Sequence, residues 1–167
     1  MASIQCRLRC AYIDNRNCLA YDPTQQDNQV WARGDNSGLN EIWTVSNYRG
    51  DPQGPWIFSQ GTGNWRMCTV GKQLCMSLTD ATPYSALWWI EQYADARGHT
   101  FFRLKSGAQN NLYVALPQVV GVPWPNVNPC VLSDTPRSIY NGTECQWYPE
   151  PADGGGGGNP FPPPRAG

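Results

Sequence analysis

The sequence is poor in charged residues, and this shortage narrows the possible functions. Only 15% of the 167 residues are charged and the net charge is −1, with no basic patch and no run of one sign. A nucleic-acid-binding surface needs such a patch, so we expect no nucleic acid partner. No stretch approaches the ~20 apolar residues of a membrane-spanning helix. The sequence therefore predicts no membrane span.

Histidine is also scarce, which limits catalysis and metal binding. His99 is the single histidine, and neither a G-x-S-x-G motif nor a clear acid–base pair accompanies it. The cysteines lack the spacing of zinc ligands. We therefore expect a protein that is not an enzyme and that uses no metal and no cofactor.

The N-terminal residues, MASIQCRLRC, lack the apolar region of a secretory signal. We expect a cytoplasmic protein if this N-terminus is native, and a secreted one if a signal peptide has been removed.

Seven cysteines leave two interpretations open. They can form disulfides across hairpins, or serve as small buried apolar side chains in a reducing cell. The pairs that bracket turns or a loop, and could bond, are Cys10 with Cys18, Cys68 with Cys75, and Cys130 with Cys145.

Turn-forming and aromatic residues are abundant by contrast. The chain has 17 Gly, 15 Pro, 8 Trp and 8 Tyr. Short apolar segments such as Cys18 to Tyr21, Val30 to Ala32 and Ile42 to Val45 alternate with polar or Gly-rich turns. Each is too short for a helix and suits a strand of about 4–8 residues. The sequence therefore predicts an all-β protein.

This succession of strands and turns recurs along the chain. In the register we favour, Cys75 and Tyr113 occupy the place of Cys18, while the segment Ala86 to Ile90 is parallel to Gln29-Val30-Trp31, with Ala86 in the place of Gln29. Trp56 to Phe58 is interpreted as a short insertion strand. The sequence thus predicts three four-strand repeats, at about residues 5–46, 64–101 and 102–150, within one domain of residues 1–150.

A sharp change of composition follows that domain. Residues 151–167 contain five consecutive glycines and then the segment Phe161-Pro162-Pro163-Pro164, which is typical of a linker ending in a polyproline-II element. Such a Gly/Pro-rich tail needs a docking surface to be ordered. We therefore expect it to contact the body of its own chain or a neighbouring subunit.

Three four-strand repeats with tryptophan near the end of most units resemble a β-trefoil. The first repeat resembles the ricin B-chain type of lectin, with Gln29-Val30-Trp31 and Asn40-Glu41-Ile42-Trp43 in the places of that family's tryptophan motifs. The resemblance implies a carbohydrate-binding protein whose partners are glycans or glycoproteins. It implies that Trp31 stacks on a sugar ring and that Gln29 and Asn40 bind hydroxyls or position the loop.

The chain departs from the family at its acidic position, which falls on Ala20. Asp22 lies two residues further on the same strand face and is our candidate to replace the acid. The predicted sugar site therefore consists of Asp22, Gln29, Trp31 and Asn40. For Trp43 and Trp147 we expect burial in the core.

Trefoil inhibitors of proteases, such as the fungal mycocypins, are a second resemblance. They act through exposed loops, and the Pro-rich loop from Pro117 to Pro129 would lose little entropy on binding. The alternative function is therefore a protease inhibitor whose loop presents Val122, Pro123, Trp124 and Pro125 to a protease.

Overall fold

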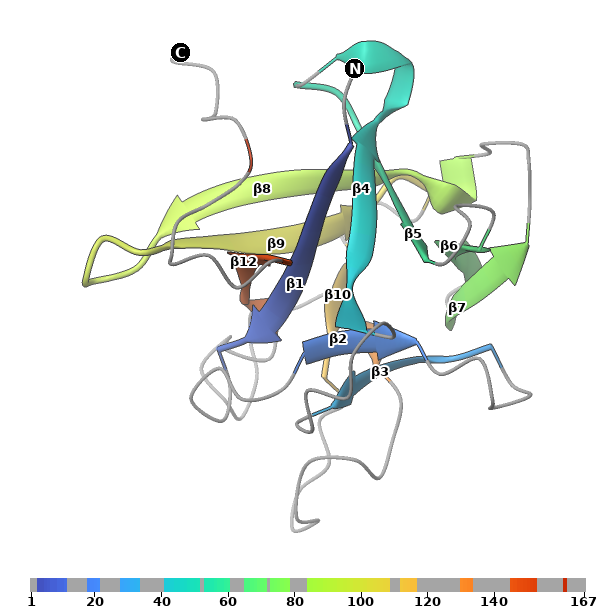
Figure 1. Ribbon diagram of the computed structural model, residues 1–167. Coiled ribbons are helices and arrows are strands. Elements are labelled where there is room, and N and C mark those ends of the chain that lie inside the picture. The colour runs from blue at the N-terminus through green and yellow to red at the C-terminus, as the bar shows by residue number, and fades with distance from the viewer. Residues whose placement is uncertain are drawn as a thin grey trace, which may run out of the picture.

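The computed structural model is built almost entirely from strands (Figure 1). It describes residues 3–11, 18–21, 28–33, 41–51, 53–60, 65–71, 73–78, 84–108, 112–116, 130–133, 145–152 and 161. Within these ranges no helix has both the length and the apolar character needed to span a membrane. The strands are β1 (Ile4–Cys10), β2 (Cys18–Tyr21), β3 (Val30–Arg33), β4 (Trp43–Asn47), β5 (Trp56–Gln60), β6 (Trp65–Val70), β7 (Gln73–Leu78), β8 (Trp88–Ala94), β9 (Thr100–Ser106), β10 (Tyr113–Ala115), β11 (Val131–Ser133) and β12 (Trp147–Pro151).

Six of these strands close into an antiparallel barrel. β1 pairs with β4, β4 with β5, β5 with β8, β8 with β9, β9 with β12, and β12 with β1. A closed barrel leaves no unpaired edge along this ring of strands. Alternation within β1 shows the inner face directly, since Cys6, Leu8 and Cys10 are buried while Arg7 and Arg9 are only partly covered.

The other strands form three hairpins that adjoin the barrel. They are β2–β3, β6–β7 and β10–β11, and their first strands pair with β1, β5 and β9 respectively. The hairpins bind one another through backbone hydrogen bonds: Met76 N donates to Asn28 O and Cys130 N donates to Val30 O, each at 2.7 Å. A six-strand barrel with three such hairpins is the β-trefoil.

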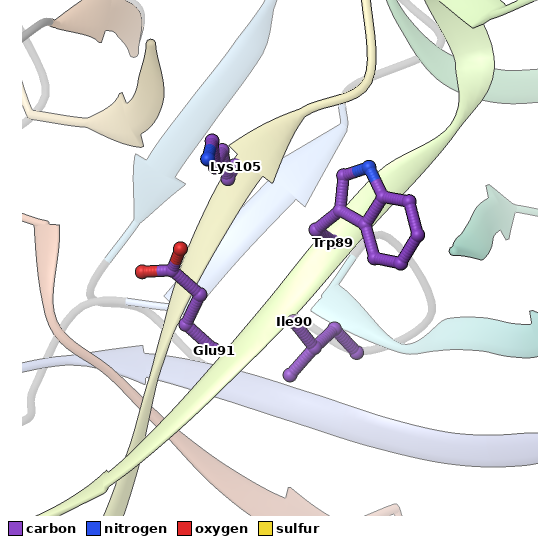
Figure 2. A pocket seen from close by; sticks show the side chains of 4 residues that line it. All are labelled: Trp89, Ile90, Glu91 and Lys105. Atoms are coloured by element: carbon purple, nitrogen blue, oxygen red, sulfur yellow. The ribbon is translucent and has the colours of Figure 1, made fainter. Parts of the chain in front are cut away.

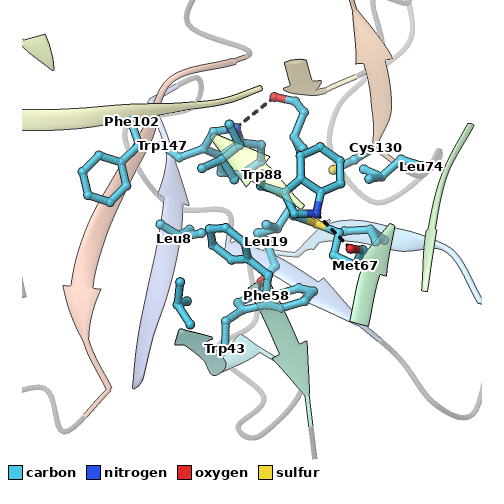
Figure 3. Packing of buried hydrophobic residues seen from close by; sticks show 14 of the residues in the cluster. Leu8, Leu19, Trp43, Phe58, Met67, Leu74, Trp88, Phe102, Cys130 and Trp147 are labelled. Atoms are coloured by element: carbon cyan, nitrogen blue, oxygen red, sulfur yellow. Dashed lines mark hydrogen bonds between the residues drawn. The ribbon is translucent and has the colours of Figure 1, made fainter. Parts of the chain in front are cut away.

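Three buried tryptophans make the same contact, one in each third of the barrel. The indole Nε1 of Trp43 donates to Leu19 O (2.8 Å), that of Trp88 to Met67 O (2.8 Å), and that of Trp147 to Val114 O (3.0 Å). Each bond ties the last strand of a four-strand set to the second strand of that set. Figure 3 shows the bond between Trp88 and Met67 as a dashed line. All three rings are fully buried, as expected above for Trp43 and Trp147.

These contacts correct the repeat register expected from the sequence. Trp88 is equivalent to Trp43 and Trp147, not to Trp31, and β8 is a fourth strand. β5 is not an insertion, because it pairs with β4, β6 and β8 as a barrel strand. The arrangement favours units β1–β4, β5–β8 and β9–β12, with the second unit beginning at Trp56 instead of at residue 64.

Phe161, from the Gly/Pro-rich tail, lies in the hydrophobic core of the same chain. It is 5% exposed and packs edge-on against Trp56 (5.3 Å between ring centroids) and Phe102 (4.8 Å). Trp56 and Phe102 pair with Trp88 and Trp147, and the equivalent partner of Trp43 is the small residue Cys6. Phe161 thus supplies a third ring to a layer in which the first unit contributes only a thiol.

All seven cysteines are free thiols, so the disulfide interpretation is wrong for this structure. Cys18 lies opposite Arg9 instead of Cys10, and a one-residue shift places the two thiols on opposite faces. Cys68 and Cys75 are directly opposed and share a hydrogen bond, with 3.4 Å between their sulfur atoms, but they form no disulfide. Burial raises the pKa of Cys6 and of Cys18 to about 12, consistent with their role as apolar core residues.

Candidate functional site

The start of β3 holds the two residues of the predicted sugar site that the structure describes, with Trp31 on the strand and Gln29 directly before it. Val30 and Ala32 point into the core and are 0% and 1% exposed. Because side chains alternate along a strand, Gln29 and Trp31 lie on the opposite face, where both are half-buried. Trp31 is therefore not a core tryptophan like Trp43.

The position at which the lectin family keeps an acid lies directly beside this ring. Ala20 is paired with Trp31 across the β2–β3 hairpin and is 1% exposed. A buried methyl group offers no acceptor to a hydroxyl, so a carboxylate for this site has to come from elsewhere. Asp22, the candidate replacement, and Asn40 both lie outside the described residues.

Glu41, which belongs to the Asn40-Glu41-Ile42-Trp43 segment, lies in the interior of the protein. It is fully buried, and its Oε2 lies 3.9 Å from Nε of Arg7 on β1. A buried carboxylate close to a guanidinium belongs to the fold and is not open to a ligand. The alternative inhibitory residues Val122, Pro123, Trp124 and Pro125 lie outside the described part of the chain.

The structure also brings together a set of residues that the sequence did not single out. On β8, Trp89, Glu91 and Tyr93 alternate with inward-facing positions. Their cross-strand partners on β9 are, in the same order, Lys105, Arg103 and Phe101. Trp89 and Tyr93 are 43% and 41% exposed. The outer surface of this hairpin therefore has an aromatic ring at each end and charged groups between them; we call it the β8–β9 face.

The carboxylate of Glu91 is held in place by two tyrosine hydroxyls. Tyr93 Oη donates to Glu91 Oε1 at 2.9 Å, and Tyr113 Oη lies 3.2 and 3.3 Å from the two oxygens. Desolvation, and after it the Glu91 charge, raises the pKa of Tyr113 to about 12. The hydroxyl therefore keeps its proton and donates throughout the neutral range.

A cleft of about 260 Å³ opens on this face (Figure 2). Trp89, Ile90 and Glu91 line it from β8, and Lys105 lines it from β9. No ion pair within 4 Å of the Lys105 ammonium is found among the described residues. The cleft thus combines an aromatic wall, a positioned carboxylate and an ammonium group.

The tip of the hairpin is braced, which keeps the face from shifting. Asp95 Oδ1 accepts from the backbone N–H groups of Arg97 (2.8 Å) and His99 (2.9 Å), around a left-handed Gly98. Its Oδ2 accepts from Tyr148 Oη on β12 at 2.7 Å, and this bond holds the pKa of Asp95 below its usual value. The tip is therefore tied to the barrel.

A sequence signal for this face did exist. Trp88 is fully buried and the adjacent Trp89 is 43% exposed, which is typical of a strand with one solvent-facing side. The expected register placed Trp88 in the position of Trp31, and this obscured the difference between the two adjacent tryptophans. Among the described residues, no group of three His, Cys, Asp or Glu side chains is placed to hold a metal ion.

Comparison by sequence finds nothing similar, whereas comparison by structure does. No protein-family model and no curated protein matches the chain. A mosquitocidal holotoxin aligns with 90% of this chain at a TM-score of 0.69 and 14% identity, but the chain spans only 17% of that protein. The Haemophilus ducreyi cytolethal distending toxin aligns with 88% of this chain and 83% of its own, at a TM-score of 0.64 and 15% identity.

SeviL bound to an asialo-GM1 saccharide is similar over nearly its whole length. The alignment covers 90% of this chain and 99% of that one, with a TM-score of 0.63 and 17% identity. At such identities the likeness shows the fold alone. The chain is therefore a β-trefoil, the fold expected from the sequence.

Proposed function

We propose that this protein binds carbohydrate without catalysing a reaction, through a principal site on the first four-strand unit. The observation that supports this most is that Trp31 on β3 and Gln29 just before it are half-buried and lie on the face opposite the core residues Val30 and Ala32. A flat apolar ring next to a planar amide is what a sugar needs, since its C–H face stacks and its hydroxyls require fixed partners.

Each residue of the proposed site has a separate role. Trp31 provides the stacking surface, Gln29 hydrogen-bonds a hydroxyl, and Asn40 supplies a second amide. Asp22 supplies the carboxylate that Ala20 cannot. The likeness in fold to SeviL, a protein bound to a saccharide, supports the same class of ligand.

A glycan array tests this function. We expect the protein to bind a restricted set of glycans, and Trp31→Ala to weaken the strongest signals by about tenfold or more, because the stacking surface is lost. Trp31→Phe, which keeps a ring, should retain part of the binding. Tyr84→Ala, which removes a 76% exposed ring elsewhere, should bind like the wild type.

Two outcomes would contradict the proposal. One is that the folded wild-type protein binds no glycan. The other is that Trp31→Ala binds every glycan as strongly as the wild type does.

A further inference from the structure

We propose that the cleft on the β8–β9 face is a second carbohydrate site, which takes a single neutral pyranose ring between Trp89, Glu91 and Lys105. This inference rests on the proposed carbohydrate-binding function but not on the site in the first unit. The two places share no residue and lie on different strands, β3 in one case and β8 with β9 in the other.

The size of the cleft favours a small ligand. Its volume of about 260 Å³ lies just below the range of roughly 300–1,000 Å³ that is usual for drug-sized molecules. The exposed indole of Trp89 forms an apolar wall for the C–H face of a sugar ring. One ring and few polar groups imply a weak site, with affinity on the order of millimolar.

The charges favour a neutral polyol over an ion. A carboxylate and an ammonium line the same cleft, so an anionic ligand meets Glu91 and a cationic one meets Lys105. Adjacent sugar hydroxyls satisfy both groups, because a hydroxyl donates to a carboxylate and accepts from an ammonium. The two charged groups therefore favour a ligand without net charge, such as a neutral sugar.

The carboxylate of Glu91 is held in position in the absence of a ligand. The hydroxyls of Tyr93 and Tyr113 hold its carboxylate, and a carboxylate has about four acceptor positions, so capacity remains for a sugar hydroxyl. The bond from Tyr148 to Asp95 braces the hairpin tip. A carboxylate that is already positioned binds without an ordering cost, as saccharide recognition through few contacts requires.

The test uses the full-length Trp31→Ala protein, so that the first site does not mask the second. The probes are galactose, glucose, mannose and N-acetylglucosamine, each at millimolar concentration. Binding of each sugar is measured by saturation-transfer NMR of the sugar signals. We expect at least one sugar to show transfer in Trp31→Ala. Adding Trp89→Ala or Glu91→Gln should weaken its binding by about tenfold or more, since a ring or a charged acceptor is lost. Adding Tyr84→Ala should leave it unchanged.

The outcomes separate this inference from the proposed function. Binding by the wild type but not by Trp31→Ala would overturn the second site and leave the first intact. The second site would also be overturned if Trp31→Ala binds a sugar and neither Trp89→Ala nor Glu91→Gln weakens that binding. If no protein binds any glycan or sugar, both proposals fail. If sugars do not bind but Trp89→Ala abolishes self-association in sedimentation, the face is a protein contact and the saccharide assignment is wrong.

Discussion

Replacing Phe161 with alanine is expected to lower the free energy of unfolding by about 3 kcal/mol and the melting temperature by about 10 °C. Phe161 is 5% exposed and packs edge-on against Trp56 and Phe102. Removing it leaves a cavity in a layer where the first unit contributes only Cys6, and two large flanking rings cannot collapse to fill it. A buried phenylalanine in this setting contributes like any core residue.

Urea and thermal unfolding of three chains would measure this effect. A chain ending at Ala152 should lose as much stability as Phe161→Ala, because both remove the ring. A chain ending at Phe161 should match the full-length protein. Equal stability of the full-length protein and the chain ending at Ala152 would show that the ring does not belong to the core.

Replacing Trp88 with alanine is expected to cost about 4 kcal/mol, and replacing it with phenylalanine about 2 kcal/mol. The alanine variant loses the packing of a fully buried ring. The phenylalanine variant keeps most of that packing but leaves the buried carbonyl of Met67 without its indole donor. The same ranking is expected at Trp43 and Trp147, which make the equivalent bonds.

The adjacent residue gives a matched control, measured by urea unfolding. Trp89 is 43% exposed, and Trp89→Ala should cost less than about 1 kcal/mol. Similar losses at Trp88 and Trp89 would contradict the assignment of Trp88 to the core and of Trp89 to the surface.

The sequence was sufficient to predict the strands because they depend on local alternation, whereas the β-trefoil was predicted from the threefold repeat and a resemblance. Leu8 and Cys10 alternate with Arg7 and Arg9, and the structure places the two sets on opposite faces of β1. Trp43 and Trp147 were expected in the core, and both are fully buried.

The register of the second unit could not be predicted because two adjacent tryptophans fit two alignments. What distinguishes Trp88 is its bond to the carbonyl of Met67, 21 residues earlier, and a backbone carbonyl has no sequence signature. The burial of Phe161 is equally non-local, since it depends on rings contributed by β5 and β9.

The candidate site was predictable only in part, for a similar reason. A resemblance singled out Gln29 and Trp31 and supplied their role, and the structure places both on the face opposite Val30 and Ala32. The β8–β9 cleft depends instead on pairing between strands, which brings Lys105 opposite Trp89, and on the reach of Tyr113 to Glu91 across β9. Such side-chain contacts depend on the strand register and not on composition.

The most direct test of the carbohydrate site is to follow the indole N–H signals of the protein by NMR during a titration with the glycan that binds best on the array. The eight tryptophans give separate probes, which single Trp→Phe variants assign. We predict a saturable shift at Trp31, whether or not Trp89 also moves, and unchanged signals for the buried Trp43, Trp88 and Trp147. Binding of the glycan with no change at Trp31 would contradict the proposed site.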